Sequence, residues 1–142
     1  MKKFKLIVLF LSLSGLIFAQ TLKDKQELLQ LCVDLPELQH LLVDESGQPL
    51  QQLVVMSNEN LQPEEVSTAK FGKTLLIVDL KTINELELNP YIVINTFKIE
   101  GNNAKVHFQL ARRNSSLWYW FDLQLAFESD KWQIVELNTM ED

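Results

Sequence analysis

The sequence has little of the residue types that usually mark a reactive or metal-binding site. Its 142 residues include one cysteine, two histidines, four glycines and four prolines. One cysteine cannot form a disulfide within its own chain, which excludes a disulfide framework. No pair of His or Cys has the spacing of metal ligands, and no glycine-rich phosphate loop, nucleophile elbow or H-E-x-x-H pattern occurs. We therefore predict no catalytic residue, no metal site and no cofactor.

What the chain does contain is typical of one ordinary globular domain. Hydrophobic residues make up 46% and charged residues 23% of it, which excludes a disordered or collagen-like chain. Cys32 falls within a helical pattern of apolar residues. We predict a buried side chain at this position, with a free thiol for redox chemistry or intermolecular pairing as the alternative.

The first residues have the pattern of an export signal. Three lysines, Lys2, Lys3 and Lys5, form a basic head, an apolar core runs over 6–18, and the small residue Ala19 follows it. This core is shorter than the roughly 20 apolar residues that a transmembrane helix needs. The pattern therefore favours a signal peptide over a membrane span.

We expect cleavage after Ala19, which leaves a signal peptide at 1–19 and one α+β domain at 20–142. Ile17 stands where a smaller residue would be the better cleavage signal, so an uncleaved anchor is the alternative. Cleavage removes three of the 13 basic residues and none of the 19 acidic ones, so the net charge changes from −6 to −9. A domain this acidic lacks the groups that neutralise phosphates. We expect a periplasmic or secreted protein without a nucleic-acid partner and without stable membrane insertion.

The segment after Thr21 has the spacing of amphipathic helices. Apolar residues recur at intervals of three and four, and Asp34, Pro36 and Glu37 form a second helix-start signal inside the run. We predict two short helices with a kink between them. Their shared apolar stripe consists of Leu28, Leu31, Cys32, Leu35, Leu38 and Leu42.

The middle of the chain predicts two short strands separated by a polar loop. The β-branched or apolar runs at 53–56 and 74–78 are typical of strands. Residues 58–73 between them are polar and read as a loop with at most one helical turn. Asp79 is placed to cap a short helix that ends at Asn89.

The last fifty residues alternate strongly and predict a four-strand meander, with strands at 91–100, 104–112, 116–128 and 131–138. Two-residue turns between the strands fix the pairing register, because a slip of one residue would move a whole apolar set to the other face. The turns pair Ile99 with Ala104, Phe97 with Val106, Val106 with Leu123, Phe108 with Phe121, Leu110 with Tyr119, Phe127 with Trp132 and Leu125 with Ile134.

This register places one apolar face of the meander against the helices. We predict an α+β fold in which the N-terminal helices pack on a curved, mainly antiparallel sheet that ends in the four-strand meander. The packed face consists of Val93, Phe97, Ile99, Val106, Phe108, Leu110, Tyr119, Phe121, Leu123, Leu125, Phe127, Trp132 and Ile134.

The pattern resembles the nuclear-transport-factor-2-like superfamily of cone-shaped α+β proteins. The resemblance spans roughly 75 residues and rests on Phe71-Gly72-Lys73, on the run 97–106 and on Lys131-Trp132-Gln133-Ile134-Val135. These segments look like short exported bacterial members, many with no assigned activity. The resemblance implies a helix-backed sheet that can enclose a small-molecule pocket. Catalytic Asp or His residues of that superfamily have no counterpart here, and fold alone does not imply function.

The polar residues on the predicted packed face are Asn95, Tyr119 and Glu136, and we treat them as candidate ligand-binding residues. The alternative is that each lies near a strand end where water reaches it. His107 falls on the outward face opposite Asp122, where we predict a cross-strand polar pair rather than a general base.

The outward face of the meander also carries large apolar residues, Ile92, Ile94, Trp118 and Trp120, which we predict to form an interface patch. The alternative is that the loop 58–73 or the N-terminal segment covers them.

We predict an exported, non-enzymatic interaction domain that binds an unknown protein partner or self-associates through the Trp118/Trp120 face. Two alternatives remain. One is a small-ligand binder, or an isomerase-like or hydrolase-like enzyme, that uses the interior of the cone. The other is an inhibitor-type protein that presents acidic loops to a basic partner.

Overall fold

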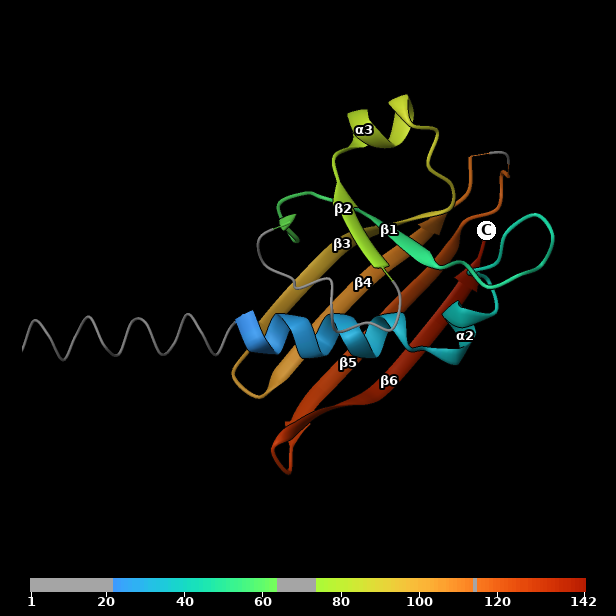
Figure 1. Ribbon diagram of the computed structural model, residues 1–142. Coiled ribbons are helices and arrows are strands. Elements are labelled where there is room, and N and C mark those ends of the chain that lie inside the picture. Colours follow the sequence, from blue (N-terminus) through green and yellow to red (C-terminus); the bar gives the residue numbers. More distant parts are fainter. Residues whose placement is uncertain (1–21, 64–73, 114) are drawn as a thin grey trace, which may run out of the picture.

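The computed structural model describes residues 22–63, 74–113 and 115–142, which form one α+β unit (Figure 1). Its six strands make one mixed sheet in the order β2-β1-β3-β4-β5-β6. The fold class predicted from the sequence is therefore confirmed. The predicted signal peptide at 1–19 lies outside the described residues. The strands are β1 (Gln52–Met56), β2 (Thr74–Val78), β3 (Tyr91–Glu100), β4 (Asn103–Ala111), β5 (Tyr119–Glu128) and β6 (Lys131–Glu141).

The helices at the N-terminal end lie across one face of the sheet, which we call the inner face (Figure 1). The first runs over residues 22–33 and α2 spans Pro36–Gln39. The kink predicted at Pro36 is confirmed, because the helix ends before Pro36 starts α2. The predicted Asp34 cap is wrong: Leu35 is the N-cap of α2, without a side-chain cap, and the Asp34 carboxylate accepts a hydrogen bond from Gln30.

The leucine stripe of these helices provides one half of the core. Its members are buried except Leu31, which is half-buried. The other half comes from the inner face of the sheet, including Phe108 and Phe121, whose rings stack with centroids 4.7 Å apart. Burying one such large side chain stabilises the fold by about 1.5–3 kcal/mol. This core fixes the helices onto β3–β6.

The parallel part of the sheet pairs β1 with β2 over their full lengths and joins β3 through two residues, Val55 and Met56. Between β2 and β3 lies α3 (Leu80–Glu85), whose predicted cap is confirmed, because the Asp79 carboxylate accepts the Thr82 amide at 2.7 Å. Both strands were expected, but their parallel pairing was not.

The meander β3–β6 has the predicted hairpins, and all seven predicted residue pairs are present, from Ile99 with Ala104 to Leu125 with Ile134. Glycine and αL turn residues support these hairpins: Gly101 has φ +59°, and Ser129 and Asp130 have φ 52° and 62°. The turn chemistry in the sequence was sufficient to set the register of the first and third hairpins. In the middle hairpin β4 ends at Ala111 and β5 begins at Tyr119, so the strand predicted to start at 116 starts later, and residue 114 of the predicted turn lies outside the described residues.

A bulge in β3 changes which of its residues face the helices. Ile94 pairs with Phe108 and Thr96 with His107, which leaves Asn95 as an extra residue. An extra residue in a strand reverses the face of the sheet to which the side chains beyond it point. Ile92 and Ile94 are therefore on the inner face, 3% and 1% exposed, and their predicted place on the outward face is wrong.

The same bulge moves Val93 to the outer face, where it pairs with Gln109, so its predicted place on the packed face is also wrong. Val93 is still buried, but it lies outside the main core cluster.

A second bulge lies in β6. Leu125 pairs with Ile134 and Gln124 pairs with Glu136, so Val135 is the extra residue. Beyond it Leu137 faces the core and Glu136 faces outward, which corrects the predicted place of Glu136 on the packed face. Ile134 is on the predicted side but is 36% exposed.

No helix within the described residues is long and apolar enough to cross a membrane.

Candidate functional site

The interior between helices and sheet is filled. The gap between the N-terminal helix, α2 and the sheet has a volume of about 10 Å³ and is lined only by apolar side chains such as Leu29, Ile94 and Phe108. Ligand pockets usually have volumes of about 300–1,000 Å³. The part of the interior that the structure describes therefore has no room for a small ligand.

The three candidate ligand-binding residues do not come together. Asn95 is an exposed bulge residue whose carbonyl accepts a hydrogen bond from Asn60 Nδ2 at 3.2 Å. Glu136 lies on the outer face, where its carboxylate accepts a hydrogen bond from Asn138. Tyr119 is half-buried at the start of β5, beside a surface pocket of about 340 Å³ that also contacts Glu37 and His40. The interior site that would have used all three has no geometric support, and a ligand role for any one of them stays a prediction.

The outer face of the meander is organised in rows that run across the strands. One row is mainly apolar and consists of Val93, Gln109, Trp120 and Met140. The next is polar and consists of Thr96, His107, Asp122 and Asn138. The third is charged at both ends and consists of Lys98, Lys105, Gln124 and Glu136.

The middle of this outer face holds polar atoms that are covered but unpaired. The predicted pair of His107 with Asp122 is confirmed as a register pair, and the His107 ring packs edge-on against Trp120 with centroids 5.4 Å apart. Within the described residues, His107 Nε2, Gln109 Oε1 and Asp122 Oδ1 have no hydrogen-bond partner. Lys105 Nζ lies 3.9 Å from Asp122 Oδ1, which is an ion-pair contact without a hydrogen bond.

The two tryptophans of the predicted interface remain at the surface. Trp118 is 39% exposed and its backbone exchanges two hydrogen bonds with Asp142, beside the start of β5. Trp120 is half-buried, and its neighbour Met140 is 63% exposed. We call Trp118, Trp120 and Met140 the indole patch. The structure keeps these tryptophans in the candidate interface and removes Ile92 and Ile94 from it.

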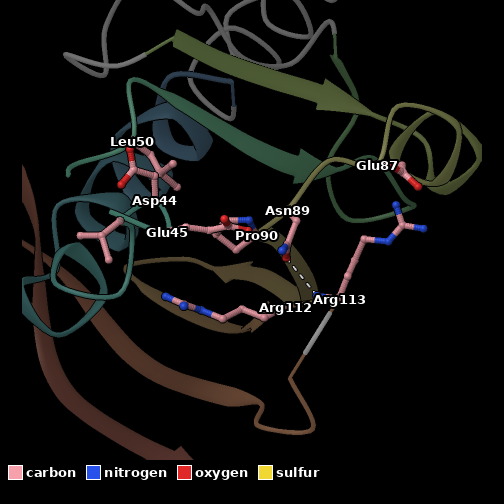
Figure 2. A pocket seen from close by; sticks show the side chains of 9 residues that line it. Asp44, Glu45, Leu50, Glu87, Asn89, Pro90, Arg112 and Arg113 are labelled. Carbon is pink, nitrogen blue, oxygen red and sulfur yellow. Dashed lines mark hydrogen bonds between the residues drawn. The ribbon is translucent and has the colours of Figure 1, made fainter. Parts of the chain in front are cut away.

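A polar pocket of about 420 Å³ opens at the end of β4 (Figure 2). Three segments that are far apart in the sequence form it: the turn 43–50, the segment 87–90 after α3, and Arg112 with Arg113. Figure 2 shows the two arginine side chains extending in opposite directions, with Arg113 directed toward Glu87. We call this the end pocket.

Hydrogen bonds hold the walls of the end pocket. Asp44 Oδ1 accepts bonds from the Ser46 amide, the Ser46 hydroxyl and the Gln48 amide, at 2.8, 2.6 and 2.9 Å. The Ser46 hydroxyl bond and then the Gln48 amide bond lower the pKa of the Asp44 carboxyl. Asn89 Oδ1 accepts the Arg113 amide at 2.9 Å, which ties the segment 87–90 to the end of β4.

Sequence reasoning did not find the end pocket. Nothing local in the sequence indicates that the turn 43–50 reaches Arg112 and Arg113. The one usable signal was the pair of arginines itself, in a chain with an excess of acidic residues.

The remaining reactive groups are isolated. Cys32 is buried on the N-terminal helix, as predicted, and burial raises the pKa of its thiol to about 12. Among the described residues no three His, Cys, Asp or Glu side chains are grouped so that they could hold a metal ion.

Comparison with known proteins adds little to this geometry. No protein-family model and no curated protein matches the chain. Among solved structures, an NTF-2-like protein of unknown function from Silicibacter pomeroyi DSS-3 aligns with 92% of this chain and 98% of its own length, at 14% identity and a TM-score of 0.33. A de novo designed β-sheet protein with a cystatin fold covers 44% of this chain and 79% of its own, at 8% identity and a TM-score of 0.33. Another de novo designed β-sheet protein covers 42% and 67%, at 12% identity and a TM-score of 0.30. At such low TM-scores these likenesses carry no argument about what the chain does.

Proposed function

We propose that this chain is an exported, non-enzymatic interaction domain of the NTF2-like kind, and that it self-associates through the outer face of β3–β6. The observation that carries the proposal is the row pattern of that face, in which apolar, polar and charged rows follow one another along the strands. The helices at the N-terminal end lie on the opposite, inner face (Figure 1).

The rows are complementary to themselves under a two-fold rotation. A two-fold axis that runs parallel to the strands, between β4 and β5, places each row opposite the same row of the second copy. The strand order of that copy is reversed, so β3 lies opposite β6 and β4 opposite β5, as a symmetric dimer interface requires. His107 then faces Asp122 of the second copy, and Lys98 faces Glu136 of the second copy. The apolar row meets an apolar row, with Val93 opposite Met140 and Gln109 opposite Trp120.

The charge of the outer face also favours a second copy. Three lysines and four carboxylates lie on it, although the whole chain has a net charge of −6. Two such faces therefore meet with little repulsion, and opposite charges set their register. These residues are Lys98, Lys105, Lys131, Glu100, Asp122, Glu128 and Glu136.

Burial of the indole patch supplies the attraction. Trp and Met are enriched at interface centres because they remove a large apolar area from water.

Sedimentation equilibrium of the purified full chain tests the proposal. We expect a dimer for the wild type and at least a ten-fold weaker dimer for Trp120→Ser, since truncating an interface hot spot costs about 2 kcal/mol or more. Ile134→Ser is the matched control, because Ile134 is also partly exposed but lies on the inner side of the sheet. A wild-type monomer across the concentration range, or equal weakening by both variants, would contradict self-association through this face.

The export part of the proposal has its own test. Expression in a bacterium followed by intact-mass measurement is expected to give a chain that begins at Gln20, recovered outside the cytoplasm. A full-length cytoplasmic product would contradict export, and a full-length membrane-bound one would indicate the uncleaved anchor.

A further inference from the structure

Strand β6 lies at one edge of the sheet and pairs with β5 alone. It ends the strand order, and no other described strand pairs with its free side (Figure 1). An edge strand presents unpaired N–H and C=O groups, and proteins usually protect such an edge with lysine, proline or a bulge. The bulge of β6 is at Val135, whereas residues 136–141 pair regularly with β5 and the run 132–142 contains neither proline nor a basic residue. The second half of β6 is therefore an unprotected edge.

The hydrogen-bond pattern shows which residues of β6 direct their backbone to this edge. Trp118 and Asp142 exchange two backbone hydrogen bonds, of 2.9 and 3.0 Å. In an antiparallel ladder such pairs alternate with pairs whose N–H and C=O groups point away from the partner strand. Counted back from Asp142, Glu141 and Thr139 belong to the second kind of pair. Both residues therefore present their N–H and C=O groups at the free edge.

A pocket of about 340 Å³ opens on the inner side of the same two residues. Thr139 and Glu141 share the inner face with Tyr119, which is half-buried, and Glu37 of α2 and His40 directly after it also line the pocket. The side chains of Glu37 and Glu141 are exposed, and neither is in an ion pair with a described lysine or arginine. Two carboxylates therefore lie in a pocket beside unpaired backbone groups.

The charge of β6 decides which partner fits this edge. The run 132–142 contains three acidic side chains, Glu136, Glu141 and Asp142, and no basic one. Two β6 edges that paired with each other would bring these like charges together, which disfavours a second copy at this place. A basic strand is favoured instead, because opposite charges on neighbouring strands attract each other. Peptides that add a strand to an exposed sheet edge are a recurring mode of recognition.

We propose that the free edge of β6 binds an extended peptide with lysine or arginine at alternate positions. The peptide adds a seventh, antiparallel strand, and its backbone exchanges hydrogen bonds with Thr139 and Glu141. Peptide residues opposite these two have their side chains on the inner side. Their basic groups then lie next to Glu141 and at the pocket. This surface is separate from the proposed dimer face, which uses outward side chains such as Met140.

Amide NMR titration of the ¹⁵N-labelled full chain tests this proposal. The probe is a short end-blocked peptide of alternating lysine and valine. One control replaces each lysine with glutamate, and the other keeps the lysines but has N-methylated lysine amides, which cannot donate to β6. We expect the probe to shift the Thr139 and Glu141 amides in a saturable way, and both controls to bind at least roughly ten-fold more weakly. No saturable shift, or equal binding of either control, would overturn the proposal.

Variants assign the binding to this edge. Thr139→Pro removes an edge donor without removing a hydrogen bond to β5, and we expect it to weaken binding roughly ten-fold. The Glu37→Gln/Glu141→Gln double variant is expected to weaken it several-fold, and it carries the test if Thr139→Pro loses its dispersed spectrum.

Glu85→Gln is the matched control, because Glu85 is an exposed carboxylate of α3, which follows β2 at the opposite edge of the sheet. We expect this variant to bind the peptide normally. Unchanged affinity in the edge and pocket variants would overturn the proposal. Shifts of the edge amides on raising the protein concentration without peptide would also overturn it, because a second copy would then occupy the edge.

Discussion

At the scale of single residues, Cys32 shows how burial controls chemistry. Its side chain is 3% exposed, and desolvation raises the pKa of the thiol to about 12. The nucleophilic thiolate is therefore almost absent at neutral pH. We expect no reaction of the folded protein with a thiol reagent such as DTNB over minutes, and full reaction of one thiol in denaturant. Rapid labelling of the native protein would contradict a buried Cys32.

Because Asp79 caps α3, we expect the stability of the fold to depend on pH. Its bonds to the Thr82 amide and hydroxyl lower the pKa of its carboxyl from the ordinary value of 3.8. A lowered folded-state pKa means that this stabilisation is complete above about pH 4–5 and is lost as the pH falls through the folded-state value. Asp79→Asn keeps an oxygen for the cap but does not titrate. Melting temperatures of the wild type and of Asp79→Asn are measured from pH 7 to pH 2, and we expect the difference in favour of the wild type to become smaller as the pH falls. A difference at pH 2 equal to that at pH 7 would contradict this account.

At the scale of elements, the two bulges decide which residues pack. Ile94 is 1% exposed and contacts the core, whereas Ile134 is 36% exposed beside the bulge at Val135. Ile94→Ala is expected to lower the free energy of unfolding by about 2–5 kcal/mol because it opens a cavity. Ile134→Ala should cost less than about 1.5 kcal/mol. Urea denaturation of both variants measures the difference. Equal costs would contradict the register of the structure.

These bulges also mark the limit of what the sequence could predict. The first and third hairpins were predicted because their turn residues and their alternating patterns agree near the turn. Asn95 and Val135 lie several residues from any turn. One is polar and the other apolar, so the two bulge positions have no residue type in common that could have indicated a bulge. The alternation therefore continued unchanged through both positions, and it misplaced Ile92, Ile94 and Glu136.

The candidate sites were predictable to different degrees for the same reason. Trp120 stands on β5 and Trp118 comes directly before that strand, so local alternation was enough to place Trp120 on the outward side. The end pocket depends on Arg113 meeting Asn89 and on Arg112 reaching Leu41, contacts between segments 24 and 71 residues apart. Such contacts follow from the tertiary fold and leave no periodic trace in the sequence.

At the scale of the whole molecule, the two faces of the sheet differ. The inner face packs against the helices and forms the core, whereas the outer face of β3–β6 carries the proposed interface. The central claim of this account is that the outer face is complementary to a second copy of itself. It requires Lys98 of one copy to lie opposite Glu136 of the other.

A charge-swap experiment tests this claim most directly. Sedimentation equilibrium compares the wild type with Lys98→Glu, with Glu136→Lys and with the double variant that carries both changes. We predict that each single variant weakens the dimer several-fold, because it places like charges opposite each other at low salt, and that the double variant restores the affinity by re-forming the pair in reverse. Additive weakening in the double variant, or a monomeric wild type, would contradict the claim.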